Sequence, residues 1–191
     1  MRKRFVFWKI VCIALIMLCL GLAVFLQFFV PWTKKEAVNV AEQIRQILPA
    51  GSVGIEGEYT DPEMPAMEYD GTDYVCLLEV PAWGISLPVQ NSWEPAKLVC
   101  SPCRYVGSSY DGTLVLGGSN QDGQFAFCGK VDLGDSVIIT DMLGSQFTYK
   151  VQSIERSKSI EEDNIQDGPY KLTLFVRERF SDKYIIVRCG L

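Results

Sequence analysis

Two short stretches, Asp111-Gly-Thr-Leu-Val-Leu-Gly-Gly-Ser-Asn120 and Leu172-Thr-Leu-Phe-Val-Arg177, decide how the chain folds. Each is a run of branched or large apolar side chains that follows a turn signal, which is typical of a buried β-strand. The same texture begins near Tyr74 and continues to the end of the 191-residue chain. This pattern predicts strands near residues 75–80, 85–89, 113–116, 136–141, 146–155, 171–176 and 184–189.

Residues 74–191 are predicted to form one mainly β domain. About 118 residues are enough for a single core, and an all-β chain of this size commonly closes into a barrel. We expect a closed barrel of about seven or eight strands with short helices. One short helix should begin at the capping-box pattern Ser159-Ile-Glu-Glu162.

The first 31 residues are predicted to form a membrane anchor. Basic residues 2–4 precede an apolar run from Phe5 to Val30, of which the 17 residues from Ile10 to Leu26 carry no polar side chain. A helix of this length with flanking aromatic residues can cross a hydrocarbon core of about 30 Å. A cleaved signal peptide is the alternative, but its apolar region is normally about 7–15 residues long and ends in an A-x-A-like site, which this run lacks.

The charge distribution predicts the orientation of the anchor and restricts the partners. Four of the 18 Lys and Arg residues lie within residues 2–9, so the N-terminus should be cytoplasmic and the rest of this single-pass protein extracytoplasmic. All 23 Asp and Glu residues follow Pro31 together with the other 14 Lys and Arg residues, so the exported part carries about −9. This charge argues against nucleic acid as a partner, because phosphate binding needs a basic face.

Residues 32–73 are predicted to connect the anchor to the barrel. Apolar residues recur at helical spacing from Lys34 to Leu48, where Pro49-Ala50-Gly51 ends the pattern. This segment is expected to be a stalk helix or a helix packed on the domain. Residues 51–73 show no periodicity and are expected to form a linker or an arm wrapped around the domain.

Several segments of the domain occur in the order and spacing of a known family. They are Tyr74-Val-Cys-Leu-Leu-Glu-Val-Pro81, Gly84-Ile-Ser-Leu-Pro-Val89, Ser101-Pro-Cys-Arg-Tyr105, the Asp111 stretch, Leu133-Gly-Asp-Ser-Val-Ile-Ile-Thr-Asp141, Phe147-Thr-Tyr-Lys-Val151, the Leu172 stretch and Tyr184-Ile-Ile-Val-Arg188. Over about 118 residues the domain resembles the sortases, cysteine transpeptidases of the Gram-positive-type cell envelope. The resemblance implies a sortase-like β-barrel.

The resemblance also identifies where the chemistry of the family should lie. In a sortase a thiolate attacks a peptide carbonyl in a sorting signal such as Leu-Pro-x-Thr-Gly, a histidine protonates the leaving amine, and an arginine stabilises the oxyanion. The positions that match the family's histidine, cysteine and arginine hold Ser119, Arg177 and Tyr184, and the chain contains no histidine at all. A guanidinium is not a nucleophile, a hydroxyl is not a general acid near neutral pH, and tyrosine carries no positive charge. We therefore expect a pseudoenzyme that acts as a binding or regulatory module, with a peptide or a neighbouring envelope protein as its partner.

Two other interpretations stay open. An active transpeptidase that attaches surface proteins to the cell wall would need a relocated cysteine, and Cys103, Cys128 and Cys189 are the candidates. Arg188 is about 13 Å beyond Tyr184 on the same strand, too far to replace the missing arginine. A purely structural envelope protein without a ligand is the third interpretation.

Arg177 and Asn120 are the candidate binding residues. A guanidinium on the floor of a former peptide groove can pair with a carboxylate, and we expect that carboxylate to come from the chain itself rather than from a ligand. Ser119 has no base within motif distance, so we expect it only to fill the place of the lost imidazole. No cofactor or metal site is predicted.

Seven cysteines are too scattered along the chain to indicate a disulfide framework. Most of them are predicted to be small buried apolar residues. Cys100-Ser-Pro-Cys103 has the C-x-x-C spacing of thiol oxidoreductases, but it leads into an extended stretch rather than a helix. We therefore expect a structural role for this pair.

Overall fold

The computed structural model describes residues 2–49, 51–53, 59, 61–160, 165–166 and 168–191. The chain divides into two compact units, Met1–Lys35 and Glu36–Leu191. Helix α1 (Arg2–Ile47) accounts for the described residues of the first unit and its last turns belong to the second. Within these described ranges, no helix combines the length and the apolar character needed to cross a membrane.

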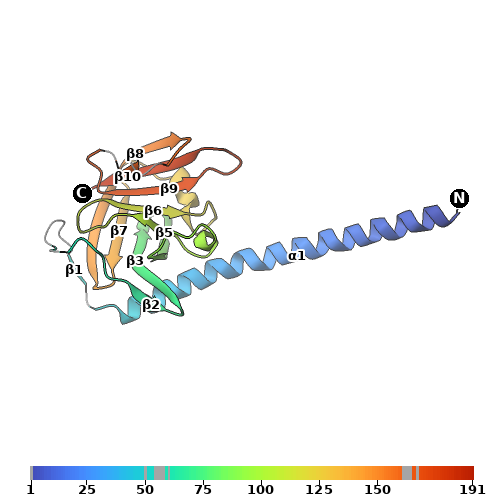
Figure 1. The fold of residues 1–191 in the computed structure, drawn as a ribbon, viewed down its shortest axis with the longest axis horizontal. Helices are drawn as coiled ribbons and strands as arrows, with labels where there is room; N and C mark the ends of the chain where they lie inside the picture. Colours follow the sequence, from blue (N-terminus) through green and yellow to red (C-terminus); the bar gives the residue numbers. More distant parts are fainter. Residues whose placement is uncertain (1, 50, 54–58, 60, 161–164, 167) are drawn as a thin grey trace. The chain divides into compact units, whose positions relative to one another are not determined.

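The second unit is built mainly from β-strands (Figure 1). Its described residues form strands β1 (Ser52–Val53), β2 (Met67–Tyr69), β3 (Thr72–Val80), β4 (Ile85–Gln90), β5 (Cys103–Val106), β6 (Leu114–Gly118), β7 (Ser136–Asp141), β8 (Ser145–Ser157), β9 (Leu172–Arg177) and β10 (Tyr184–Gly190). Three short 3₁₀ helices connect them, η1 (Pro81–Trp83), η2 (Lys97–Val99) and η3 (Phe125–Gly129).

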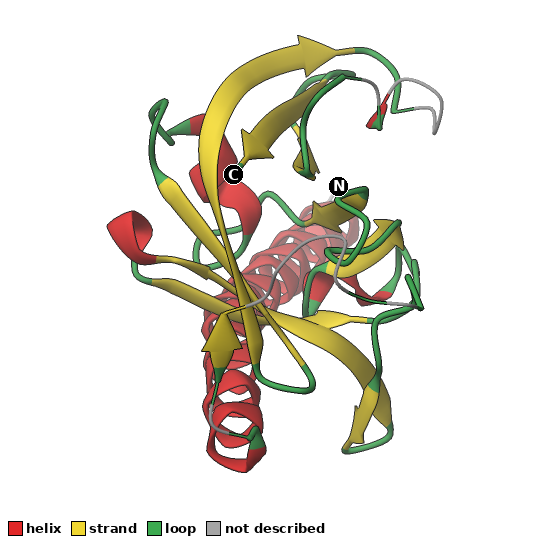
Figure 2. Ribbon diagram, turned by 90° about the vertical axis from the view of Figure 1, so that its left-hand side faces the viewer, coloured by secondary structure: helices red, strands yellow, loops and turns green. Residues whose placement is uncertain are grey.

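Eight of these strands close into a barrel, seen as the curved strands of Figure 2. The order around the ring is β3, β4, β5, β6, β9, β10, β8 and β7, and β7 pairs back to β3. The neighbours β4 and β5 are parallel, as are β6 and β9, and the other pairs in the ring are antiparallel. The predicted mainly β, closed barrel is confirmed.

The predicted strands are all present, with boundaries that shift by a few residues. The structure adds the short strands β1 and β2. It also adds β5, which the sequence suggested only as an extended stretch, because its four residues are partly polar and three of them are only half-buried. The helix predicted to begin at Ser159 includes Glu161 and Glu162, which lie outside the described residues.

The segment predicted as stalk and linker packs on the barrel. The last turns of α1 bury Ala41 and Ile44 in a small cluster with Tyr74, Leu77 and Met142. Strand β1 pairs in parallel with β8, and Met64 is only 1% exposed within the main core. The compact unit Glu36–Leu191 therefore includes the last turns of α1 and the described residues of this segment together with the barrel.

The main core fills the inside of the barrel and contains three cysteines. Cys76, Cys128 and Cys189 are each 0% exposed and pack among large apolar residues such as Phe125 and Leu174. Burial raises the pKa of Cys76 and Cys128 above the ordinary thiol value and raises the pKa of Cys189 to about 12. Burial also raises the pKa of Tyr110, whose hydroxyl donates a hydrogen bond of 2.6 Å to the buried Asp141 carboxylate.

Replacing Ile44 by Ala should test whether α1 contributes to the stability of the barrel unit. Ile44 is 0% exposed, so Ile44→Ala should leave a cavity and lower the free energy of unfolding by about 2–4 kcal/mol. The matched control is Ile47→Ala one turn later, where the side chain is 57% exposed and the change should be below about 0.5 kcal/mol. Urea unfolding of the full-length chain in detergent measures both variants, and equal effects would contradict the packing described here.

The buried thiols predict a loss of stability at alkaline pH. Their pKa values in the folded protein lie above the unfolded value of about 8.5, so their stabilising effect is complete below that pH and is lost as the pH rises towards the folded values. The free energy of unfolding should fall above about pH 9. In Cys189→Ala, the slope between about pH 9 and 11 should be shallower by about 1.4 kcal/mol per pH unit. Urea unfolding at several pH values checks this, and an unchanged slope would show that Cys189 ionises in the folded protein.

Candidate functional site

Three neighbouring strands bring together the positions that the sequence resemblance assigned to the histidine, cysteine and arginine of the family. Strand β6 ends at Gly118, directly before Ser119, and runs parallel to β9 with Gly118 beside Val176. Arg177 ends β9 and lies directly opposite Tyr184, the first residue of β10. The fold therefore gathers Ser119, Arg177 and Tyr184 at one end of the barrel wall.

Asn120 links the end of β6 to the end of β9 by a hydrogen bond. Its side-chain amide donates a hydrogen bond of 3.1 Å to the backbone carbonyl of Arg177. Arg179 donates from its guanidinium to the backbone carbonyl of Asn120 at 2.8 Å. Two arginines thus flank the segment where a sortase would carry its catalytic groups, and the contact of Asn120 is with the backbone of Arg177 rather than with its side chain.

The Arg177 side chain points away from the core. It is exposed, and no described carboxylate lies within ion-pair distance of its guanidinium. The intrachain ion pair expected for Arg177 stays a prediction, since acidic residues 161–163 and 167 lie outside the described residues. Strand alternation directs Val176 into the core and Arg177 to the outer side at the point where β9 ends.

The hairpin between β9 and β10 forms an open depression beside Arg177. The depression has a volume of about 530 Å³ and is lined by Arg177 and residues 178 and 180–182. Phe180 at the tip is fully exposed and adopts a positive φ of 61°, a conformation that is strained for a bulky residue. Glu178 pairs with Arg156 at 3.2 Å, so the exposed charges at the rim of the depression are the guanidinium of Arg177 and the carboxylate of Asp182.

Aromatic side chains cover the outer face of the barrel wall next to this position. Phe175 lies under Trp93 and Tyr105, with ring centroids 5.5 and 5.4 Å away, and Tyr184 follows at 6.3 Å. A Cβ atom on Gly117 would lie 2.4 Å from the Trp93 ring, so only glycine allows the ring to approach the sheet this closely. We call Trp93, Tyr105, Phe175 and Tyr184 the aromatic cover.

The cysteines proposed as relocated nucleophiles are poorly suited to attack a substrate. Cys103, Cys128 and Cys189 are each 0% exposed. Burial raises the pKa of Cys103 as well, so each of the three stays a neutral thiol near pH 7. Cys100 is the exposed cysteine of the barrel unit, and its neighbour Cys103 begins a strand, as expected for a pair outside a strand–helix redox motif.

Arg188 is also occupied, in agreement with its exclusion as a replacement for the missing arginine. It is 7% exposed and donates to the backbone carbonyl of Ile165 at 3.1 Å. Its guanidinium also pairs with Glu155 at 3.3 Å and lies over the Tyr170 ring. The described residues contain no group of three side chains that could hold a metal ion.

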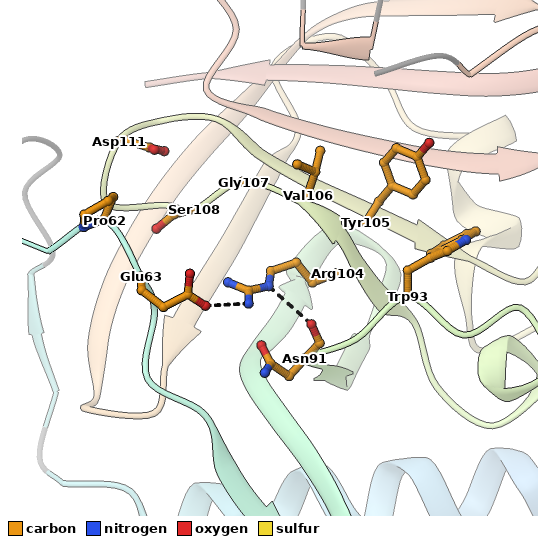
Figure 3. Close-up of a pocket in the computed structure, with 10 residues that line it drawn as sticks. All are labelled: Pro62, Glu63, Asn91, Trp93, Arg104, Tyr105, Val106, Gly107, Ser108 and Asp111. Atoms are coloured by element: carbon orange, nitrogen blue, oxygen red, sulfur yellow. Dashed lines mark hydrogen bonds and ion pairs between the residues drawn. The ribbon is translucent and has the colours of Figure 1, made fainter. Parts of the chain in front are cut away.

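A second charged site, which sequence reasoning missed, lies where β4 and β5 separate. Figure 3 shows Arg104 of β5 directed into a pocket of about 370 Å³. Its guanidinium pairs with Glu63 at 2.7 Å and donates to the backbone carbonyl of Asn91 at 3.3 Å. Trp93 and Tyr105 of the aromatic cover also line the pocket, and Figure 3 shows their rings directed away from the guanidinium.

The sequence offered only a weak signal for this second site. Arg104 stands beside the buried Cys103 in a short strand, so alternation would direct one of them inward. Its partner Glu63 comes from the segment without periodicity, 41 residues earlier in the chain. No local pattern in the sequence joins the two residues.

Three solved structures illustrate what the chain is similar to. Sortase C-1 from Actinomyces oris matches with a TM-score of 0.53 and 20% identity over 82% of this chain and 97% of that one. Sortase A from Corynebacterium diphtheriae matches with a TM-score of 0.53 and 16% identity over 80% and 82%. Sortase A from Listeria monocytogenes matches with a TM-score of 0.51 and 20% identity over 62% and 86%.

No family model and no curated protein matches the sequence. At identities of 16–20% the structural matches establish the architecture alone. The ring of eight strands described above is shared with sortases from several bacteria, so the barrel unit of this chain has a sortase-like fold.

Proposed function

We propose that this chain is a membrane-anchored, extracytoplasmic sortase-like protein that binds a peptide segment or a neighbouring envelope protein without cleaving it. The observation that carries the proposal is the exposed Arg177 guanidinium at the position where a sortase carries its thiol, in a chain without histidine. The acyl-enzyme of a transpeptidase needs an ionisable nucleophile and a proton donor for the leaving amine. Among Ser119, Arg177 and Tyr184 there is neither a thiol nor an imidazole to fill these two roles.

The aromatic cover supports binding rather than turnover. It occupies the outer face of β6 and β9, beside the three matching positions, so the chain's own rings fill part of the surface there. The exposed Arg177 and Phe180 offer a cation and an apolar ring next to each other at the rim. Such a pair is suited to hold a segment that carries both an acidic and an apolar side chain.

The two parts of the proposal that concern the membrane, the anchor and the extracytoplasmic location of the barrel, are argued from the sequence alone. The basic residues at positions 2–4, the apolar run to Val30 and the acidic remainder of the chain favour a single-pass protein with a cytoplasmic N-terminus. An extracytoplasmic barrel next to the membrane is placed to meet exported segments of other envelope proteins.

The active alternative keeps one observation in its favour, the presence of four cysteines in β3, β5, η3 and β10. Each would need to leave the core, lose its proton against a raised pKa and find a proton donor other than histidine. These three requirements make the alternative the weaker proposal.

A transfer assay tests the absence of catalysis. The full-length chain in detergent is incubated with a Leu-Pro-x-Thr-Gly peptide and an amine nucleophile, and mass spectrometry follows cleavage and transfer. We expect neither product, because no thiolate and no imidazole are available. An active sortase under the same conditions is the positive control. The variant Arg177→Cys should also give no transfer, since it restores a thiol without a proton donor, and transfer by the native chain would overturn the proposal.

Thiol labelling tests the active alternative separately. At pH 6 under native conditions, iodoacetamide should modify Cys100 slowly and leave Cys76, Cys103, Cys128 and Cys189 unmodified, because these four are 0% exposed. Unfolding the chain should expose all of them, and Cys100→Ser should abolish native labelling within the barrel unit. Rapid modification of any one of the four in the native protein would favour a relocated nucleophile.

A further inference from the structure

The guanidinium of Arg104 is the starting point, because it is a largely enclosed cation that is only partly hydrogen-bonded. Its side chain is 14% exposed. Of its five N–H groups, one bonds to Glu63 and one to the Asn91 carbonyl, and the described residues provide no further acceptor. Figure 3 shows the guanidinium facing the open pocket between these two partners.

Glu63 is the exchangeable member of this ion pair. Its side chain is 69% exposed. Its backbone lies in a segment whose residues before and after Glu63 pack against the barrel. Met64 is buried in the main core, and Tyr59 stacks on Tyr110 with ring centroids 3.6 Å apart. The Glu63 carboxylate can therefore leave Arg104 by rotation of its side chain alone, without movement of the backbone.

The shape of the guanidinium selects the kind of anion that fits the pocket. Trp93 and Tyr105 also line the pocket, but their rings meet each other edge to face at 5.1 Å and are directed away from the guanidinium in Figure 3. The planar guanidinium matches a carboxylate with two parallel hydrogen bonds. The carboxylate of Asp111 also lines the pocket and disfavours a doubly charged anion such as phosphate.

We infer that this pocket binds a carboxylate of a peptide ligand, which displaces Glu63 from Arg104. Exchange of one carboxylate for another keeps Arg104 paired throughout, so no enclosed charge is left without a counter-ion. Glu63 then acts as an internal competitor that excludes weakly bound anions. The inference rests on the proposed function and names a carboxylate as the group of the peptide ligand that the protein recognises. It requires no chemistry at Arg177.

A minimal probe can test the recognised group. N-acetylphenylalanine carries one carboxylate and one aromatic ring, N-acetylphenylalaninamide lacks the carboxylate, and inorganic phosphate lacks the ring. Each is titrated into the ¹⁵N-labelled full-length chain in detergent, and NMR follows the indole N–H signals of the four tryptophans. We expect only the acid to move one indole signal, which Trp93→Phe identifies by its absence. Equal shifts from acid and amide, shifts from phosphate, or no shift from the acid would overturn the inference.

Two variants separate the roles of the ion-pair partners. Glu63→Gln should tighten binding of N-acetylphenylalanine about fivefold, as expected for the loss of one partly exposed ion-pair competitor. Arg104→Gln should weaken binding by at least about tenfold. Glu94→Gln is the matched control, because Glu94 forms an ion pair of similar length with Lys97, at 2.8 Å, and its loss changes the net charge equally.

The gain in affinity keeps the test decisive even if Arg104→Gln unfolds, since a damaged protein does not bind more tightly. An unchanged affinity in Glu63→Gln, or an equal gain in Glu94→Gln, would contradict the exchange at Arg104. The transfer assay is independent of this titration. Transfer by the native chain would remove the proposed absence of catalysis and leave the carboxylate site intact, whereas a failed titration would remove only the site.

Discussion

The parallel pairing of β6 with β9 is the constraint on which the rest of the structure depends. Five residue pairs, from Leu114 beside Leu172 to Gly118 beside Val176, join two strands that are more than 50 residues apart in the chain. This pairing closes the ring between β5 and β10. It also sets Ser119 next to Arg177, because each residue directly follows the last matched pair. The closure of the barrel and the composition of the candidate site therefore have the same cause.

The register of this pairing also explains the aromatic cover. Gly117 lies beside Phe175, and the missing side chain of Gly117 leaves room for Trp93 to reach the sheet. Phe175 then contacts both Trp93 and Tyr105, which extends the apolar surface from β9 across to β5. Trp93 and Tyr105 also line the Arg104 pocket. The missing side chain at Gly117 therefore affects both the outer face beside Arg177 and the residues that line the second charged site.

The sequence predicted the features that depend on local pattern and on order along the chain. The strands and the closed barrel follow from short apolar runs separated by turn signals, and the segment order pointed to the sortase-like fold. It could not predict features that depend on contacts between distant segments. The arm that carries Met64 and Glu63 has no periodicity, yet it packs on the barrel, and the ion pair of Glu63 with Arg104 joins residues 41 positions apart. The direction of the Arg177 side chain likewise depends on where the hairpin between β9 and β10 begins, which no local pattern specifies.

The two arginines show why the position of a cation decides its role. Arg177 is exposed at a rim, where water competes for its hydrogen bonds and where an ion pair contributes little to affinity on its own. Arg104 is enclosed, so a carboxylate bound there exchanges water for a directed pair of hydrogen bonds in a less polar setting. The aromatic cover fills the outer face beside Arg177, whereas the Arg104 pocket stays open next to it, so the enclosed cation is better placed than the exposed one to hold a carboxylate.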